Sequence, residues 1–252
     1  MLELVTDTAV DLARSDARHG VGLFETIRVE GGRPLHLDRH LRRLARGAAY
    51  LGLPEPPPAG AVRDVLIART PCAGLPLGVV RLLALDERLI VRAGAWEPDW
   101  PEAVEIAVAE DLTRLSSSPL CRFKTMSYLE NVLLAREARR RGLQEVVARN
   151  EAGLLTDGAR TTVFLVMGGE VCTPAVCHGA LPGIVREIVL EAGAAAERAL
   201  TVQDLEAADA VLLTNALREV VPVTRVAGWG EKDPAPPALL RLREVLERAK
   251  RA

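Results

Sequence analysis

Residues 20–44 read GVGLFETIRVEGGRPLHLDRHLRRL, and this stretch carries the clearest local structure signals of the chain. The β-branched and aromatic residues of Val21–Glu30 predict a strand. Gly31-Gly32 then predicts a hairpin turn into a short second strand over Arg33–Leu37. Apolar residues recur at helical spacing over Asp38–Leu51, which predicts a helix. The stretch therefore predicts a hairpin followed by a helix.

Outward from this stretch, helices and strands mix without regular βαβ alternation, which favours an α+β (mixed α/β) fold. In the first half, the predicted elements are a helix at 61–69 and strands at 79–85, 89–95 and 104–108. In the second half, they are helices at 127–141 and 184–193 and strands at 144–149, 154–156, 161–167, 170–172 and 210–214. The polar segment EDLTRLSSSP (110–119) predicts an inter-domain linker. We therefore expect domains at 1–110 and 120–252, joined by a linker at 111–119.

Composition excludes several classes of function. The chain has 252 residues, is 49% hydrophobic and 26% charged, and has a formal net charge of −2, so nothing points to nucleic acid or an anionic membrane as a partner. No apolar run approaches the roughly 20 residues of a membrane span. The N-terminal MLELVTDTAVDLARSD lacks the pattern of a signal peptide, so we expect a cytoplasmic protein. The four cysteines and His19, His36 and His178 show no metal-ligand spacing, so no metal site is expected.

Lysine is rare in this chain. Lys and Arg total 32, yet the only lysines are Lys124, Lys232 and Lys250. Lys232 lies in a Pro-rich turn and Lys250 at the C-terminus, so both are expected to be solvated charges. Lys124 instead lies at the start of a predicted helix among apolar and amphipathic neighbours. A partly buried lysine amine can act as a nucleophile that forms a Schiff base, although a lysine at a helix start can also simply extend its amine to water.

Three further features suggest binding of a charged ligand, and each has a simpler alternative. Leu181-Pro182-Gly183 precedes a predicted helix whose free N–H groups could bind a phosphate, but most such helix starts bind nothing. Arg43 shares a helix face with His40 and could pair with the same phosphate, or could belong to a solvated basic run. Asp157, between two strands, could hold a protonated ring nitrogen or merely form an Asp-Gly turn.

Five blocks in consistent order resemble the class IV aminotransferases, the pyridoxal-phosphate enzymes of fold type IV. They are residues 20–44, FKTMSYLENVLLAREA (123–138), GLLTDGARTTVFLV (153–166), ALPGIVREIVLEAG (180–193) and LLTNALREVVPVTRV (212–226). The resemblance implies a small N-terminal α/β domain, a larger C-terminal domain with a barrel-like sheet, and pyridoxal 5'-phosphate bound between them. It also implies a small-molecule substrate and a homodimer.

The resemblance assigns roles around the cofactor ring to three residues. Lys124 matches the catalytic lysine that binds the cofactor covalently and then moves protons. Tyr128 looks like the tyrosine that approaches the ring hydroxyl, although packing of a helix would also explain it. Asp157 occupies the position of a family glutamate that holds the pyridine nitrogen in its protonated form.

Five other residues match the positions that bind the cofactor phosphate. Arg43 matches the phosphate arginine of the family. The backbone amides of Ile184 and Val185 match the helix start that binds the phosphate. Asn215 and Ala216 match the loop that closes the phosphate site from another strand.

The chain also departs from the family pattern. Asp157 is one methylene shorter than the usual glutamate, and Thr162 replaces an asparagine. The substrate-binding loop that transaminases carry after the strand at 81–85 is reduced here to a tight turn, Asp86-Glu87-Arg88. This shortening, the compact length and Thr214-Asn215-Ala216-Leu217 make the chain look most like the 4-amino-4-deoxychorismate lyases. A branched-chain or D-amino-acid transaminase, a non-catalytic cofactor binder and a phosphate-binding module without cofactor are the alternatives.

Overall fold

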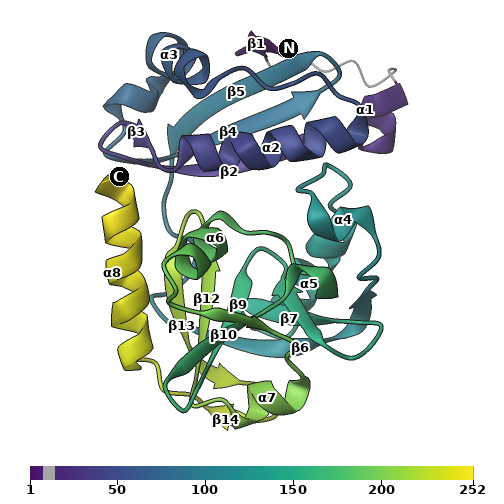
Figure 1. Ribbon diagram of the computed structural model, residues 1–252, viewed down its shortest axis with the longest axis vertical. Helices are drawn as coiled ribbons and strands as arrows, with labels where there is room; N and C mark the ends of the chain where they lie inside the picture. Colours follow the sequence, from purple (N-terminus) through teal and green to yellow (C-terminus); the bar gives the residue numbers. More distant parts are fainter. Residues whose placement is uncertain (8–14, 252) are drawn as a thin grey trace. The chain divides into compact units, whose positions relative to one another are not determined.

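Helices and strands alternate irregularly along the chain in the computed structural model, which describes residues 1–7 and 15–251 (Figure 1). The chain divides into two units by its internal contacts. The first unit comprises Met1–Glu97 and Phe123–Tyr128, and the second comprises Pro98–Arg122 and Leu129–Ala252. Both units combine helices with a mixed sheet, which confirms the expected α+β fold. Part of the N-terminal segment examined for a signal peptide, residues 8–14, lies outside the described residues.

A five-stranded sheet forms the body of the first unit, in the order β1-β5-β4-β2-β3. Only the pairing of β1 with β5 is parallel. The elements of this unit are, in chain order, β1 (Glu3–Val5), α1 (Ser15–His19), β2 (Leu23–Glu30), β3 (Arg33–Pro34), α2 (Leu37–Leu51), α3 (Ala59–Arg69), a 3-10 turn (Pro71–Gly74), β4 (Leu77–Leu85) and β5 (Arg88–Ala95).

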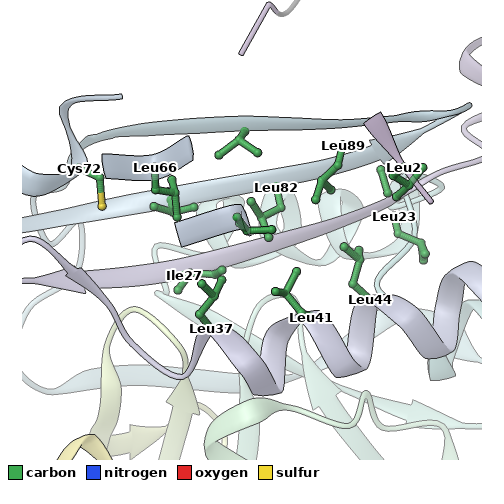
Figure 2. Close-up of a cluster of buried hydrophobic side chains, with 14 of the residues drawn as sticks. Leu2, Leu23, Ile27, Leu37, Leu41, Leu44, Leu66, Cys72, Leu82 and Leu89 are labelled. Atoms are coloured by element: carbon green, nitrogen blue, oxygen red, sulfur yellow. The ribbon is translucent and has the colours of Figure 1, made fainter. Parts of the chain in front are cut away.

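Side-chain alternation along β2 decides which face of this sheet is the core. Leu23, Glu25, Ile27 and Val29 are almost fully buried, and the residues that alternate with them are partly exposed. Figure 2 shows Leu23 and Ile27 beside Leu37, Leu41 and Leu44 of α2. Because successive strand residues point to opposite faces, β2 has one face toward the helices and a second, more polar face. This second face carries Phe24, Thr26 and Arg28.

The second unit contains a nine-stranded mixed sheet, in the order β11-β10-β9-β12-β13-β6-β7-β8 with β14 paired to β13. Its strands are β6 (Val104–Arg114), β7 (Glu145–Asn150), β8 (Leu155–Gly158), β9 (Thr162–Met167), β10 (Glu170–Pro174), β11 (Ala196–Arg198), β12 (Ala210–Asn215), β13 (Glu219–Val226) and β14 (Gly230–Glu231). Its helical elements are α4 (Pro119–Arg122), α5 (Leu129–Arg140), a 3-10 turn (Val176–His178), α6 (Ile184–Glu191), α7 (Val202–Ala207) and α8 (Pro237–Arg251).

Two of the apolar clusters in this unit lie on opposite faces of β9 and β12. Phe164 and Leu212 pack with residues of α6 and α8 on one face. Val163 and Leu213 pack with β6 and β13 on the other. Both faces are covered, so β9 and β12 form nearly continuous apolar runs, as expected for buried strands. Within this unit, α8 runs alongside β13, as Figure 1 shows.

The boundary between the units differs from the linker expected at residues 111–119. The division falls at Glu97/Pro98, and β6 continues through Arg114, so part of the expected linker is strand. Glu110–Arg114 carries mainly polar residues because the side chains of Glu110, Asp111 and Thr113 lie at the surface of the strand. Phe123–Tyr128 then belongs to the first unit, where Leu23 and Thr125 form an antiparallel bridge.

Two lysines expected to be solvated are in fact largely buried. Lys232 is only 9% exposed, and its ammonium donates to the carbonyls of Glu206 at 2.6 Å and Ala208 at 2.7 Å, at the C-terminal end of α7. The expectation was wrong because a cation at a helix C-terminus can satisfy unpaired carbonyls and the helix dipole. The side chain of Lys250 is 11% exposed and pairs with Glu219 at 2.8 Å. In residues 1–7 and 15–251, no helix has the length and apolar character that a membrane span requires.

Candidate active site

Lys124 lies on an extended segment that pairs with the start of β2. The Phe24 N–H donates to the Lys124 carbonyl at 2.9 Å, and the Met126 N–H donates to the Gly22 carbonyl at 2.9 Å. The sequence predicted a helix from residue 127, but α5 begins at Leu129. The backbone of Lys124 is therefore held by sheet-like hydrogen bonds and not by a helix start.

The side chain of Lys124 extends along two aromatic rings. Its Nζ lies 4.2 Å from the ring centre of Phe24 and 4.9 Å from that of Tyr128. These rings meet edge to face with centres 5.0 Å apart, and Nζ donates to the Tyr128 hydroxyl at 3.4 Å. The two rings and the Tyr128 hydroxyl therefore hold the Lys124 amine in one orientation. Tyr128 lies beside the lysine, and its expected approach to a cofactor hydroxyl stays a prediction.

A buried ionic network joins β2 to α2 in the same unit. Glu25 is 1% exposed, and its carboxylate accepts from Arg43 Nε at 2.8 Å and Nη2 at 2.6 Å. His40 Nδ1 lies 2.7 Å from Glu25 Oε2. Although burial opposes ionisation, Arg43 and His40 outweigh it and lower the pKa of Glu25 from 4.5 to about 2.

This network fixes the guanidinium of Arg43, the residue matched to the phosphate arginine. Two of the five N–H groups of the guanidinium donate to Glu25, which fixes the plane of the group. Burial lowers the pKa of His40 despite the attraction of Glu25, which favours the neutral imidazole. Arg43 is thus a rigid, buried cation held by Glu25, which fits a phosphate ligand.

Asp157 lies on β8 in the second unit and is 5% exposed. Its Oδ1 lies 3.1 Å from Arg114 Nε, and its Oδ2 accepts from the Leu181 N–H at 3.1 Å. Arg114 therefore places a positive charge directly beside the Asp157 carboxylate. A carboxylate held in this way fits a partner for a cationic ring N–H.

The helix α6 begins at Ile184, three residues after Leu181, whose N–H contacts Asp157. Gly183 is the N-cap residue and provides no side-chain cap, so the first-turn N–H groups of Ile184 and Val185 lack intrahelical acceptors. A Cβ on Gly183 would approach Thr162 Oγ1 to 2.9 Å. The glycine thus permits close packing of the helix start on β9.

A second strand brings polar groups to the same end of the sheet. Thr214 of β12 lies directly opposite Thr162, and its buried hydroxyl has no hydrogen-bond partner among residues 1–7 and 15–251. Asn215 Oδ1 accepts from the N–H groups of Leu217 and Arg218, at 3.0 and 2.8 Å, and so shapes the turn that presents Ala216. An uncapped helix start, a glycine and an unpaired hydroxyl together fit a phosphate group.

Glu145 supports the turn that follows Asp157. This buried carboxylate accepts from the Ala159 and Arg160 N–H groups at 2.9 and 3.2 Å, and from Thr161 Oγ1 at 3.0 Å. The Val146 N–H donates a fourth hydrogen bond at 3.2 Å. Burial raises the pKa of Glu145 because these hydrogen bonds only partly replace its hydration. Glu145 therefore anchors the β8–β9 turn from β7.

The structure places the candidate residues in two groups. The first unit contains Lys124, Tyr128 and Arg43, and the second contains Asp157, Ile184, Val185, Asn215 and Ala216.

Sequence reasoning missed Glu25 and Arg114. Glu25 had a detectable signal, because it is the one carboxylate in the otherwise apolar alternation of Leu23, Ile27 and Val29. Arg114 was hidden inside the expected linker.

The His, Cys, Asp and Glu side chains of residues 1–7 and 15–251 do not gather into a metal site. No group of three or more His, Cys, Asp or Glu side chains there could hold a metal ion. Cys72, Cys121 and Cys172 are buried free thiols, and Cys177 is an exposed one. The candidate chemistry therefore centres on the lysine and the phosphate-binding groups.

The chain is similar in sequence to known proteins of one family. The family model described as amino-transferase class IV matches residues 22–226. A candidate branched-chain-amino-acid aminotransferase of Methanocaldococcus jannaschii is 28% identical over 242 residues, which covers 88% of this chain and 84% of that one. The branched-chain-amino-acid aminotransferase of Salmonella typhimurium is 30% identical over 183 residues, which covers 71% of this chain but only 53% of that enzyme.

The structural comparison concerns the fold alone. A candidate 4-amino-4-deoxychorismate lyase of Legionella pneumophila superposes with a TM-score of 0.86 at 24% identity, over 98% of this chain and 99% of that chain. The expected fold type is therefore confirmed along essentially the whole chain.

Proposed function

Because this chain belongs to the class IV aminotransferase family, we propose that it is a 4-amino-4-deoxychorismate lyase that forms 4-aminobenzoate and pyruvate. The cofactor is pyridoxal 5'-phosphate, as in the rest of the family. The substrate is a small molecule with a primary amine, a cyclohexadiene ring and two carboxylates. Aromatisation of the ring drives the release of the enolpyruvyl group.

The observation that carries the lyase assignment is the connection between β4 and β5. Leu85 pairs directly with Arg88, so only Asp86 and Glu87 form the turn, with a positive φ of 54° at Asp86. The substrate-binding loop that resemblance to transaminases would place here is therefore missing. A lyase needs no second substrate, so it has no need of a loop that selects an amino acceptor.

Lys124 is the proposed catalytic residue. Pyridoxal 5'-phosphate supplies an aldehyde for the substrate amine and a ring that withdraws electrons from the amine-bearing carbon. Lys124 Nζ holds the cofactor at rest, then takes the proton from that carbon and later returns a proton to the product. Tyr128, 3.4 Å from Nζ, orients the amine between these steps.

The other candidate residues bind and polarise the cofactor in this proposal. Arg43, the Ile184 and Val185 amides, and the turn at Asn215-Ala216 bind its phosphate. Asp157 receives the ring N–H, and Arg114 pairs with its carboxylate. Asp157 is one methylene shorter than the family glutamate, so it is expected to hold the ring proton less firmly and to weaken electron withdrawal by the ring. Asp157→Glu is expected to raise the ring-nitrogen protonation and change the rate, and an unchanged rate contradicts a role at the ring nitrogen.

A transaminase is the second candidate, and the sequence relatives favour it. The aligned curated proteins are named branched-chain-amino-acid and D-alanine aminotransferases. A transaminase transfers nitrogen to a 2-oxo acid and so needs two substrates in turn. The two candidates share a cofactor and differ in whether an amino acceptor is required.

One assay separates these functions. Purified protein with pyridoxal 5'-phosphate is incubated with 4-amino-4-deoxychorismate, and in parallel with amino acid and 2-oxo acid pairs. Pyruvate released without an acceptor supports the lyase. Nitrogen exchange only in the presence of an acceptor rejects the lyase in favour of the transaminase.

Borohydride reduction tests the role of Lys124 independently of turnover. Reduction followed by peptide mapping is expected to trap the cofactor on Lys124 and not on Lys232 or Lys250. Lys124→Ala is expected to abolish both the trapped peptide and activity, whereas Lys250→Ala leaves both intact. Cofactor trapping on Lys124 with no activity on any substrate class indicates a non-catalytic binder.

We also expect a cytoplasmic homodimer, as in the resemblance described above. Sedimentation equilibrium of the purified chain gives the mass directly. A single species at the monomer mass of 27.2 kDa would contradict the dimer.

A further inference from the structure

The polar face of the first unit's sheet is the face on which the Lys124 amine lies. Leu23, Glu25 and Ile27 point toward α2, so Phe24 points to the opposite face. Lys124 Nζ lies 4.2 Å from the Phe24 ring centre. A ligand that reacts at this amine therefore has the residues of this face as neighbours.

Two arginines share this face on the adjoining strands. Thr26 of β2 lies opposite Arg81 of β4, and Arg81 lies opposite Arg92 of β5. Residues directly opposite in an antiparallel pair point to the same face. Since Thr26 and Phe24 are two residues apart on β2, both arginines lie on the Phe24 face, and both are exposed.

This pair is unfavourable for folding in the absence of a ligand. Like charges directly opposite in a sheet are destabilising. Other arginines of the same sheet have carboxylate partners, as Arg28 has in Glu30 at 2.6 Å. Within residues 1–7 and 15–251, no carboxylate lies within ion-pair distance of Arg81 or Arg92. Neither guanidinium makes a hydrogen bond to another of these residues. The pair thus offers two guanidinium groups to an external anion.

The distance from the amine suits a small substrate. Arg81 is one strand and two residues from Phe24, an offset of about 5 Å across and about 7 Å along the sheet. Arg92 is one further strand away. An arginine side chain is long enough to span much of this offset, so Arg81 is placed to bind the part of a ligand near the amine and Arg92 the part farther out.

We propose that Arg81 and Arg92 bind the two carboxylates of a dianionic substrate whose amine reacts at Lys124. The identity of that substrate rests on the proposed function, because 4-amino-4-deoxychorismate has two carboxylates. Planar guanidinium groups bind carboxylates through paired hydrogen bonds. The preference for a dicarboxylate over a monocarboxylate comes from the second arginine, since a single guanidinium would bind one carboxylate of either ligand equally well.

Binding of isophthalate and benzoate to the holoenzyme tests this directly, since the two ligands differ by one carboxylate. Calorimetric titration is expected to show isophthalate binding at least about tenfold tighter than benzoate, as a charged hydrogen-bonded contact predicts. Arg81→Gln and Arg92→Gln each bring the ratio close to one, and Arg92→Lys keeps part of the preference. Arg69→Gln, on the exposed end of α3, is the matched control and leaves the ratio unchanged.

Kinetics and stability complete the test. With 4-amino-4-deoxychorismate, Arg92→Gln is expected to raise KM about tenfold while kcat changes less than about threefold. The thermal midpoint of each glutamine variant stays equal to or above that of the parent chain, since a repulsive pair is removed. Equal binding of both ligands by the parent chain, or a ratio that no arginine variant changes, overturns the proposal. A parent chain that prefers isophthalate but releases no pyruvate rejects the lyase function alone.

Discussion

Replacing Glu25 with glutamine should strongly destabilise the first unit. The pKa of Glu25 is lowered from 4.5 to about 2, and at about 1.4 kcal/mol per pKa unit its ionised form contributes about 3 kcal/mol to folding at neutral pH. Independently of the pKa, removing one partner of a buried ion pair generally lowers the free energy of unfolding by about 3–5 kcal/mol. Because glutamine can still accept one hydrogen bond from Arg43, we expect a loss of about 3 kcal/mol.

Equilibrium urea unfolding at pH 7, followed by circular dichroism, measures this loss. Glu30→Gln is the matched control, because Glu30 lies on the same strand but pairs with Arg28 near the surface, with a side chain 32% exposed. A surface pair contributes about 0–1 kcal/mol. The two substitutions remove the same charge and differ mainly in burial.

The pH dependence of the loss has a definite sign. A carboxyl with a lowered pKa in the folded state contributes stability above its unfolded pKa, and this contribution disappears as the pH falls from 4.5 toward 2. His40→Asn in both compared chains removes the titration of the imidazole, so the remaining difference reports Glu25. A loss below about 1 kcal/mol at pH 7, or one that does not shrink in acid, would refute the assignment of an ionised buried Glu25.

Three further predictions concern packing and reactivity. Gly158→Ala places a Cβ 2.5 Å from Thr161 Oγ1 and 2.6 Å from the Glu145 carboxyl carbon, so urea unfolding should show that the free energy of unfolding falls by about 1–3 kcal/mol. The control Gly60→Ala, in open space on α3, should instead raise it by up to about 1 kcal/mol. Equal effects of the two substitutions would contradict the close packing at Gly158. Lys232→Met leaves two helix-end carbonyls unpaired and should cost about 1–3 kcal/mol in the same assay, whereas a neutral result would show the ammonium to be solvated. Cys177 is the exposed thiol among the four cysteines, so mass spectrometry after brief iodoacetamide treatment should find it labelled first, and earlier labelling of a buried cysteine would contradict the burial.

Much of the first unit could be predicted from local sequence patterns. The alternation of β2, the glycine turn and the helical periodicity of α2 are properties of neighbouring residues, so each element formed close to the predicted bounds. The two-residue β4–β5 turn was also correct, because turn length follows from the spacing of two apolar runs. Lys124 was singled out by its rarity and its neighbours.

The candidate site was only partly accessible to that reasoning. The roles of Arg43, Asp157 and the α6 start came from resemblance and remain predictions. Their partners could not be found, because Glu25 and Arg43 are separated by 18 residues and the ion pair of Arg114 with Asp157 joins two strands distant in sequence. The helix and strand periodicities of a sequence do not predict which charged residues, distant in the chain, form ion pairs.

Residue order over short spans was enough to predict the local elements, the family and Lys124 as the candidate catalytic lysine. Tertiary structure decided which charges are buried and paired. It turned Lys232 from an expected surface charge into a helix-end donor and placed Arg81 and Arg92 side by side on the Lys124 face. Strand register across a sheet sets such neighbours, and register depends on the packing of whole faces.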